Sequence, residues 1–389
     1  MVYCSHIGCM SDSGKRNGGS MTVLGQVLRR EERDILKMRR LYELYGYKKY
    51  KMNKFEHYDL YLENKSFLAS NNIVTFTDAG GTLLALKPDI TLSIVKNAPE
   101  VITSPEKVYY CENVYRSAGQ DGGIREILQV GIEYIGEMNT YAQGEVLSLA
   151  AKSLGEVSEN VLIGVSHMGL ITALLERAGL QDAARREALR CIGEKNAHEL
   201  RAVCEREQVE PEAAGLLAAV VATYGDYAKG LARIRVLLKD LPQRDPSWQA
   251  VEELGAVYRV LEAVGCGSRV VLDFSVTNDM DYYNGITFQG FVDGIPQHVL
   301  SGGRYDTLVK KFGKDAGAIG FAIYPDLLER LAGEEHDCVD VLLTYGDADP
   351  AVTAAQAEKL TSAGLRVYVL REDTGKVRYK EHIQLDKRF

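Results

Sequence analysis

The chain has 389 residues, of which 46% are hydrophobic and 26% are charged, a balance that is typical of globular proteins and excludes disordered, collagen-like and coiled-coil chains. No run approaches the ~18 consecutive apolar residues of a membrane-spanning helix, so a spanning protein is also excluded. The 46 Lys and Arg against 54 Asp and Glu give a net charge of −8, which counts against a general nucleic-acid binder because such proteins are normally basic.

The N-terminal residues 1–20 have no hydrophobic periodicity and contain Cys4, His6 and Cys9. We predict that this segment is a disordered extension and that Met21 is a natural start. The seven cysteines of the chain are scattered and form no CxxC pair, a pattern that indicates free thiols in a reducing cytosol. We therefore expect a cytoplasmic protein without a metal site.

Residues 25–45 have the apolar spacing of a helix. Ten Lys and Arg lie between residues 29 and 54, and a solvated helix face explains them better than an RNA-binding surface, which stays an alternative. The next pattern, over residues 73–87, is typical of a hairpin. Asp89 follows Pro88 and is predicted to open a short helix.

A second strand pair is predicted over residues 108–115 and 126–135. A helix over residues 139–154 and a strand over residues 161–166 then lead into an almost entirely helical stretch. We interpret this stretch, approximately residues 167–265, as a helical insertion.

Strand patterns return over residues 269–276 and 282–292, with Asp293-Gly294 as a hairpin turn after them. Short helices flank one more strand at residues 318–323. The tail has a β-α-β pattern, with a strand over residues 339–344, a helix over residues 351–363 and a strand over residues 365–370.

These elements predict an α+β fold in which helices flank a mostly antiparallel sheet. The core is expected to span residues 21–333 and to include the helical insertion. Residues 338–389 are expected to form a small, partial α/β domain, and the polar residues 334–337 are expected to link the two.

The strand over residues 125–135 carries the most informative pattern, because strand residues alternate between two faces. One face has Leu128, Val130, Ile132 and Tyr134, and the other has Arg125, Gln129, Gly131 and Glu133. A carboxylate and an amide that flank a glycine make a polar floor for a small polar ligand. The solvent-facing side of an antiparallel sheet has the same pattern, and the strand by itself favours that explanation.

Three other segments carry polar groups that suit a ligand. Asp89 and Thr91 offer a carboxylate, a hydroxyl and free N–H groups to an ammonium ion, although a helix N-cap explains them by itself. Tyr282 and Tyr283 have the apolar body and polar tip of pocket residues, but the chain has 22 tyrosines. Residues 301–306 contain two glycines that could approach a phosphate, and a structural turn explains them better. We find no catalytic motif and predict no catalytic residue and no cofactor.

Four stretches in chain order resemble the motifs of class II histidyl-tRNA synthetases, namely residues 86–91, 114–136, 281–287 and 301–322. The resemblance covers roughly residues 27–333. It implies the class II synthetase fold and a site for free histidine.

The resemblance also assigns roles to residues. It implies that Asp89, Thr91 and Gln129 hold the ammonium group, and that Glu133 contacts the imidazole nitrogens together with a tyrosine. The predicted histidine-binding set is Asp89, Thr91, Arg116, Arg125, Gln129, Glu133, Tyr282 and Tyr283.

Three departures from the synthetase pattern argue against catalysis. The resemblance implies an adenine-reading glutamate and two arginines where this chain has Ala118, Asn278 and Leu327. Each preorganised donor contributes ~3–4 kcal/mol to transition-state stabilisation, so we expect no histidyl-adenylate to form. A histidine site without adenylation resembles the regulatory subunits of ATP phosphoribosyltransferase. That resemblance implies a non-catalytic protein that activates a short-form catalytic subunit and mediates histidine feedback inhibition at the first step of histidine biosynthesis.

The implied partners are free histidine and the catalytic subunit, with a homodimer inside a hetero-oligomer and no membrane. Nucleic acid is not expected, because the 51 residues from Val339 are few for an anticodon-binding domain. Two alternatives stay open. One is a divergent histidyl-tRNA synthetase, which would need other arginines at the site. The other is a stand-alone amino-acid-binding or signalling paralogue with a different partner.

Overall fold

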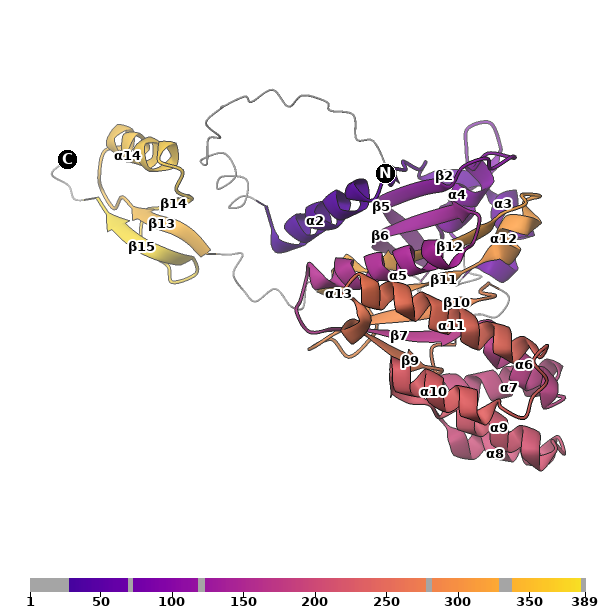
Figure 1. Ribbon diagram of the computed structural model, residues 1–389. Coiled ribbons are helices and arrows are strands. Elements are labelled where there is room, and N and C mark those ends of the chain that lie inside the picture. Colours follow the sequence, from indigo (N-terminus) through magenta and orange to yellow (C-terminus); the bar gives the residue numbers. More distant parts are fainter. Residues whose placement is uncertain (1–27, 69–72, 118–122, 278–281, 329–337, 386–389) are drawn as a thin grey trace, which may run out of the picture. The chain divides into compact units, whose positions relative to one another are not determined.

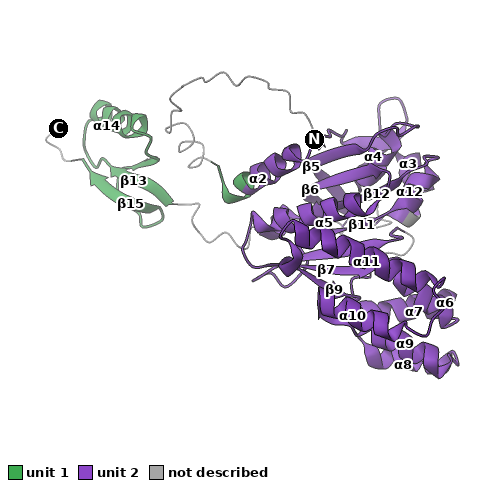
Figure 2. Cartoon of the chain, in the orientation of Figure 1, with its two compact units in different colours: residues 1–33, 332–389 green, residues 34–331 purple. Residues whose placement is uncertain are grey.

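A computed structural model of the chain describes residues 28–68, 73–117, 123–277, 282–328 and 338–385 (Figure 1). Residues 34–331 form one unit, and the C-terminal residues belong to a second (Figure 2). The predictions for residues 1–20, for Ala118 and Asn278 and for the linker 334–337 lie outside the described residues. Within the described ranges, no helix is long and apolar enough to cross a membrane.

The larger unit is built on a nine-stranded sheet with the order β1-β5-β6-β12-β11-β10-β7-β9-β8. In this order the strands are β1 Lys48–Lys49, β5 Glu106–Ser117, β6 Ile124–Gly136, β12 Gly317–Ile323, β11 Leu300–Arg304, β10 Ile286–Val292, β7 Val161–His167, β9 Val270–Asp273 and β8 Tyr224–Asp226. Neighbours are antiparallel except in the pairs β1–β5 and β7–β9. The predicted α+β fold with a mostly antiparallel sheet is confirmed.

Both faces of this sheet are covered. On one face the core contains side chains of three helices, which are α2 Arg30–Leu44, α5 Thr140–Gly155 and α11 Pro246–Ala263. The other face packs on α3 Tyr58–Glu63, α4 Thr91–Asn97, α12 Asp306–Lys311 and a small sheet of β2 Phe55–His57, β4 Leu83–Leu86 and β3 Thr75–Thr77. The part of the polar face of β6 that carries Gln129, Gly131 and Glu133 is therefore buried in the protein and does not face solvent.

The helical insertion contains five helices in addition to α11. They are α6 Met168–Arg177, α7 Asp182–Gly193, α8 Ala197–Arg206, α9 Pro211–Val221 and α10 Tyr227–Leu237. The short strand β8 interrupts them and was not predicted, because three residues are too few for a periodic pattern. Gly179 follows α6 with a φ of 68°, a conformation that suits the glycine that ends the helix.

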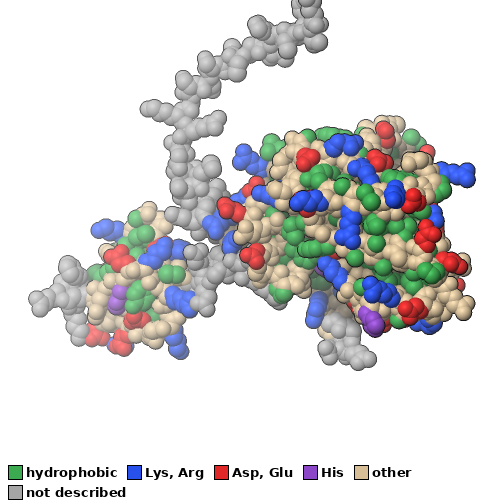
Figure 3. Space-filling view, turned by 60° about the horizontal axis from the view of Figure 1, so that its bottom comes forward, with side chains coloured by type: hydrophobic (Ala, Val, Ile, Leu, Met, Phe, Trp, Pro, Cys, Tyr) green, Lys and Arg blue, Asp and Glu red, His purple; other side chains and the backbone are tan. Residues whose placement is uncertain are grey.

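The basic segment around α2 is a solvated helix face. Lys37 pairs with Asp34 at 3.1 Å, and Arg39 pairs with Glu43 at 2.9 Å on the same helix. The face shown in Figure 3 mixes Lys and Arg with acidic and apolar side chains. These pairs favour the structural explanation of the charges over an RNA-binding surface.

The expectation that residues 301–306 form a turn is wrong, because most of them belong to β11. A Cβ atom on Gly302 would lie 2.4 Å from the carbonyl oxygen of Gly320, and one on Gly303 would lie 2.5 Å from Cδ1 of Tyr283. The two glycines therefore allow close packing inside a sheet and are not there to turn the chain. Gly294 does turn the chain with a φ of 85°, but β11 begins only at Leu300, so the hairpin with β10 is wider than predicted.

The C-terminal unit contains β13 Cys338–Thr344, α14 Pro350–Ser362, β14 Val367–Leu370 and β15 Arg378–Gln384. The central strand β13 is parallel to both neighbours. This arrangement confirms the β-α-β prediction and adds β15. That strand was missed because its sequence, RYKEHIQ, is largely charged and exposed.

Candidate functional site

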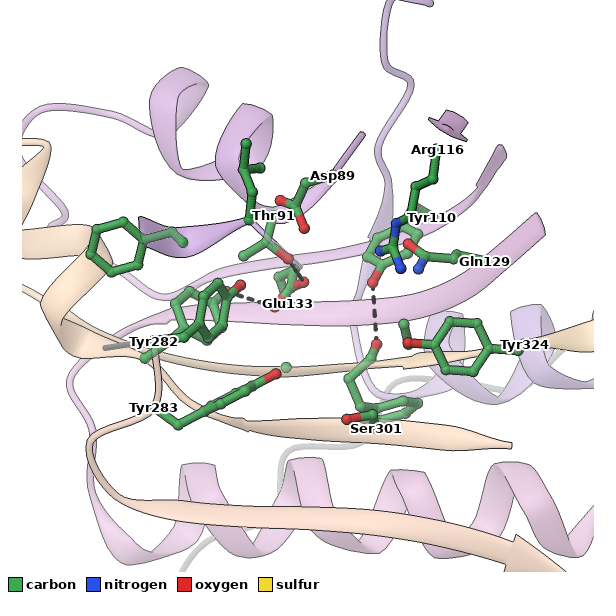
Figure 4. A pocket seen from close by; sticks show the side chains of 16 residues that line it. Asp89, Thr91, Tyr110, Arg116, Gln129, Glu133, Tyr282, Tyr283, Ser301 and Tyr324 are labelled. Atoms are coloured by element: carbon green, nitrogen blue, oxygen red, sulfur yellow. Dashed lines mark hydrogen bonds between the residues drawn. The ribbon is translucent and has the colours of Figure 1, made fainter. Parts of the chain in front are cut away.

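A cavity of about 220 Å³ lies between β6, β12 and β11 of the large sheet and the start of α4 (Figure 4). Seven of the eight residues predicted for histidine binding line it, namely Asp89, Thr91, Arg116, Gln129, Glu133, Tyr282 and Tyr283. The structure does not bring Arg125 into the cavity. Arg125 lies opposite Arg116 in the β5–β6 register, but it is exposed. Strand alternation shows which face of the sheet a residue occupies, but it does not show how far along the strand that face is covered by other elements.

Glu133 is the most deeply buried carboxylate of the site, with 2% of the residue exposed. Its Oε1 accepts a hydrogen bond of 2.8 Å from the Thr91 hydroxyl, and its Oε2 accepts one of 2.6 Å from the Tyr305 hydroxyl. Burial raises the pKa of Glu133 to about 8, although both hydrogen bonds act to lower it. A Cβ atom on Gly320 would lie 1.7 Å from Oε2, so only a glycine in β12 leaves space for this carboxylate.

Asp89 has both of the roles that the sequence suggested, since it caps a helix and also faces the cavity. Its Oδ1 accepts a hydrogen bond of 2.8 Å from the backbone N–H of Leu92, which caps the first turn of α4. The same side chain also lines the cavity. Burial raises its pKa, whereas the backbone hydrogen bonds and the charge of Arg116 act in the opposite direction.

The other side of the cavity carries the arginine. In Figure 4, Thr91, Glu133 and Tyr282 lie toward one side and Arg116, Gln129 and Tyr324 toward the other. Gln129 is 5% exposed. The Nε of Arg116 is buried and has no hydrogen-bond partner among the described residues. A buried guanidinium N–H without a partner is costly, and an anionic group in the cavity would satisfy it.

Aromatic rings form much of the wall. The Tyr282 ring lies 4.6 Å from that of Tyr283, 5.6 Å from that of Tyr305 and 6.0 Å from that of Phe67, measured between centroids. Tyr305 was not predicted, although it directly follows Arg304 in one of the stretches singled out in the sequence. The cavity is smaller than the ~300–1,000 Å³ that is usual for drug-sized ligands, and its mixed polar and aromatic lining suits a small polar molecule. The described residues contain no cluster of metal-binding side chains.

Comparisons with known proteins identify the family. A family model described as histidyl-tRNA synthetase matches residues 21–328. The ATP phosphoribosyltransferase regulatory subunit of Oceanobacillus iheyensis is 29% identical over 314 residues, which are 80% of this chain and 73% of that protein. The one of Caldanaerobacter subterraneus is 30% identical over 292 residues, 74% of each. The chain belongs to the histidyl-tRNA synthetase family, among its ATP phosphoribosyltransferase regulatory subunits.

A solved structure has the same fold over almost its whole length. It is described as an ATP phosphoribosyltransferase regulatory subunit/histidyl-tRNA synthetase from Bacillus halodurans, and it is 26% identical. The match has a TM-score of 0.72 and covers 91% of this chain and 93% of that one.

Of the three departures that argue against catalysis, one lies in the described residues. Leu327, which stands where the resemblance implies a phosphate-binding arginine, is in α13 Pro325–Leu328. It is half-buried and packs against the larger hydrophobic core. An apolar side chain at this position has no charge with which to pair a phosphate.

Proposed function

We propose that this chain is a regulatory subunit of ATP phosphoribosyltransferase without catalysis of its own. It binds free histidine and mediates activation and feedback inhibition of the first step of histidine biosynthesis. The relatives that carry this name support the regulatory role. The observation that carries the histidine site is the pairing, in one cavity of about 220 Å³, of the buried Glu133 carboxylate with the unpartnered Nε of Arg116.

Histidine occupies the cavity with its imidazole toward Glu133 and its α-carbon end toward Arg116. Glu133 accepts a hydrogen bond from an imidazole N–H, and Tyr283 lies beside the ring. Asp89, Thr91 and Gln129 hold the ammonium group. Arg116 pairs with the carboxylate, a role supported by its free, buried Nε, because a charged hydrogen bond is stronger than one between neutral groups.

The partner of this subunit is the short-form catalytic subunit, and the functional assembly is a hetero-oligomer that contains a homodimer of this chain. Histidine inhibits when it binds the inhibited assembly more tightly than the active one. A difference of about 1–3 kcal/mol, or 5- to 150-fold in affinity, is enough for such control.

A divergent histidyl-tRNA synthetase is the second candidate, supported by the family model and by Arg116 in the cavity. It is disfavoured by the apolar Leu327. Calorimetric titration with histidine and histidine-dependent ATP–pyrophosphate exchange separate the two functions. We expect saturable histidine binding with exchange at background. ATP–pyrophosphate exchange well above background would establish that the chain acts as a synthetase. The absence of histidine binding would refute the assigned histidine site.

A further inference from the structure

A partly buried cluster of four charged or ionisable side chains lies beside the cavity, and we call it the Glu253 junction. It consists of His167 at the end of β7, Glu253 in α11, Arg304 at the end of β11 and Asp306 at the start of α12. Nη1 of Arg304 lies 2.8 Å from Oε1 of Glu253, and Nη2 lies 2.7 Å from Oδ2 of Asp306. Nε2 of His167 lies 3.3 Å from Oε2 of Glu253.

The junction holds Glu253 as a carboxylate. Burial acts to raise the pKa of Glu253, but the hydrogen bond from His167 and the charge of Arg304 hold it below its usual range. Arg304 is thereby shared between two carboxylates in a partly buried setting. Removing one charge from such a cluster leaves the arginine incompletely paired, which is more damaging than losing a surface pair.

On one side, the junction holds the segment that carries the cavity tyrosines. The backbone N–H of Asp306 donates to Oδ1 of Asn284 at 3.0 Å, and Nδ2 of Asn284 donates to Oδ2 of Asp306 at 3.3 Å. The backbone N–H of Asn284 also donates to the carbonyl of Arg304 at 3.1 Å. Asn284 directly follows Tyr283, whose ring packs against Gly303 beside Arg304. Asn284 thus joins the segment of the cavity tyrosines to Asp306 and Arg304 of the junction.

On the other side, the junction reaches the helical insertion. Glu253 belongs to α11, and Nδ1 of His167 accepts a hydrogen bond of 3.3 Å from the N–H of Leu170, which caps α6. The N–H of Met168 donates to the carbonyl of Gly285 at 2.8 Å, so the start of α6 and the segment after the tyrosines are joined directly.

We propose that Arg304 and Glu253 are positioning residues that tie Tyr283 of the cavity to the helical insertion, so that histidine occupancy and the order of α6 and α11 change together. The identity of the ligand rests on the proposed function. The tie between Tyr283 and the helical insertion does not rest on it, because this tie consists of contacts within the protein. Coupling of this kind is reciprocal: whatever loosens the insertion weakens histidine binding, and histidine protects the insertion.

The test compares wild type with Glu253→Gln, which keeps the shape of the side chain and removes its charge, and with Arg304→Lys, which keeps the charge but replaces the two guanidinium nitrogens that contact Glu253 and Asp306 by a single ammonium nitrogen. The control is Glu187→Gln, which removes the charge of an exposed pair with Arg206 in the same insertion. Hydrogen exchange is followed by mass spectrometry over residues 282–290, 166–174 and 248–258, with and without histidine, and histidine affinity is measured by calorimetry.

We expect both junction variants, without ligand, to exchange about fivefold or more faster over residues 282–290 and 166–174, and the control to match wild type. We expect their histidine affinity to fall by about fivefold or more and histidine to protect residues 248–258 in wild type only. If ligand-free exchange in Glu253→Gln and Arg304→Lys equals wild type, the tie does not exist. If ligand-free exchange rises in the variants while their histidine affinity and the protection of residues 248–258 by histidine are unchanged, the junction has only a structural role and the proposed coupling is wrong. If wild type binds no histidine, the proposed function fails, and the ligand-free exchange still decides the tie.

Discussion

The hydroxyl of Tyr305 donates a 2.6 Å hydrogen bond to the carboxylate of Glu133, although 172 positions separate the two residues in the chain. Glu133 lies in β6, and Tyr305 follows β11, two strands away across β12. The pairing of three strands thus brings together a carboxylate and its donor at the centre of the cavity. The predictions below depend on this buried carboxylate and on the arginine beyond it.

The first prediction is that Glu133→Gln stabilises the empty protein at high pH. The pKa of Glu133 is about 8 in the folded protein and 4.5 ordinarily, so the folded state keeps a proton that the unfolded state releases. The carboxyl group therefore lowers the free energy of unfolding progressively as pH rises from 4.5 to 8, in total by roughly 5 kcal/mol. Urea denaturation at pH 4.5 and at pH 9 should show the variant equal to wild type at the lower pH and several kcal/mol more stable at the higher one. A difference that is the same at both pH values would contradict the buried, raised carboxyl.

The second prediction is that Glu133→Gln loses histidine affinity by about ten- to hundredfold, because a charged hydrogen bond contributes about 1.5–3 kcal/mol. Calorimetric titration measures the loss. Glu145→Gln is the matched control, since Glu145 is also a buried glutamate but pairs with Lys107 at 2.6 Å outside the cavity. The control should be less stable than wild type and bind histidine normally. Equal affinities in wild type and Glu133→Gln would remove Glu133 from the site.

The third prediction concerns proton uptake when histidine binds. At pH 9 Glu133 is ionised and free imidazole is neutral, so formation of an imidazolium–carboxylate pair takes up close to one proton, in addition to the fraction of a proton that the α-amino group takes up to bind as ammonium. At pH 5 both groups carry a proton, and forming the same pair releases one. Near pH 7 the proton passes from Glu133 to the ligand, and net exchange is small. Calorimetry in two buffers of different ionisation enthalpy counts these protons at each pH, and a count near zero at all three would exclude the pair.

The fourth prediction tests Arg116 with histamine, which has the imidazole and the amine of histidine but no carboxylate. Wild type should bind histidine about tenfold or more tighter than histamine, because only histidine pairs with the guanidinium. Arg116→Gln should abolish this preference while keeping its histamine affinity. Arg125→Gln, on the neighbouring strand directly opposite, should keep the preference because that side chain is exposed and outside the cavity. If Arg116→Gln still prefers histidine, another group holds the carboxylate.

The sequence was sufficient for the parts of the fold that depend on local periodicity. The alternation in β6 correctly put Gln129 and Glu133 on one face, because each successive strand residue reverses direction. The same rule could not show that α4 covers that face, and so the strand by itself favoured a solvent-facing side over a buried site.

Features that depend on distant pairing were missed. Tyr305 meets Glu133 only because β11, β12 and β6 are neighbours, and no local pattern indicates that contact. The strand β11 was expected to be a turn because its two glycines have the local composition of one. Their real cause, the close approach of Gly320 and Tyr283, lies in other parts of the chain. Arg125 shares the correct face but lies beyond the cavity, which strand alternation cannot reveal.

The most direct test of the central claim is the rate of a short-form ATP phosphoribosyltransferase catalytic subunit, measured with this chain while histidine is titrated. We predict that wild type raises the rate and that histidine then suppresses it. Glu133→Gln should still raise the rate but should need about tenfold or more histidine for the same suppression. Identical histidine inhibition with wild type and with Glu133→Gln, or no effect of this chain on the rate, would contradict the account.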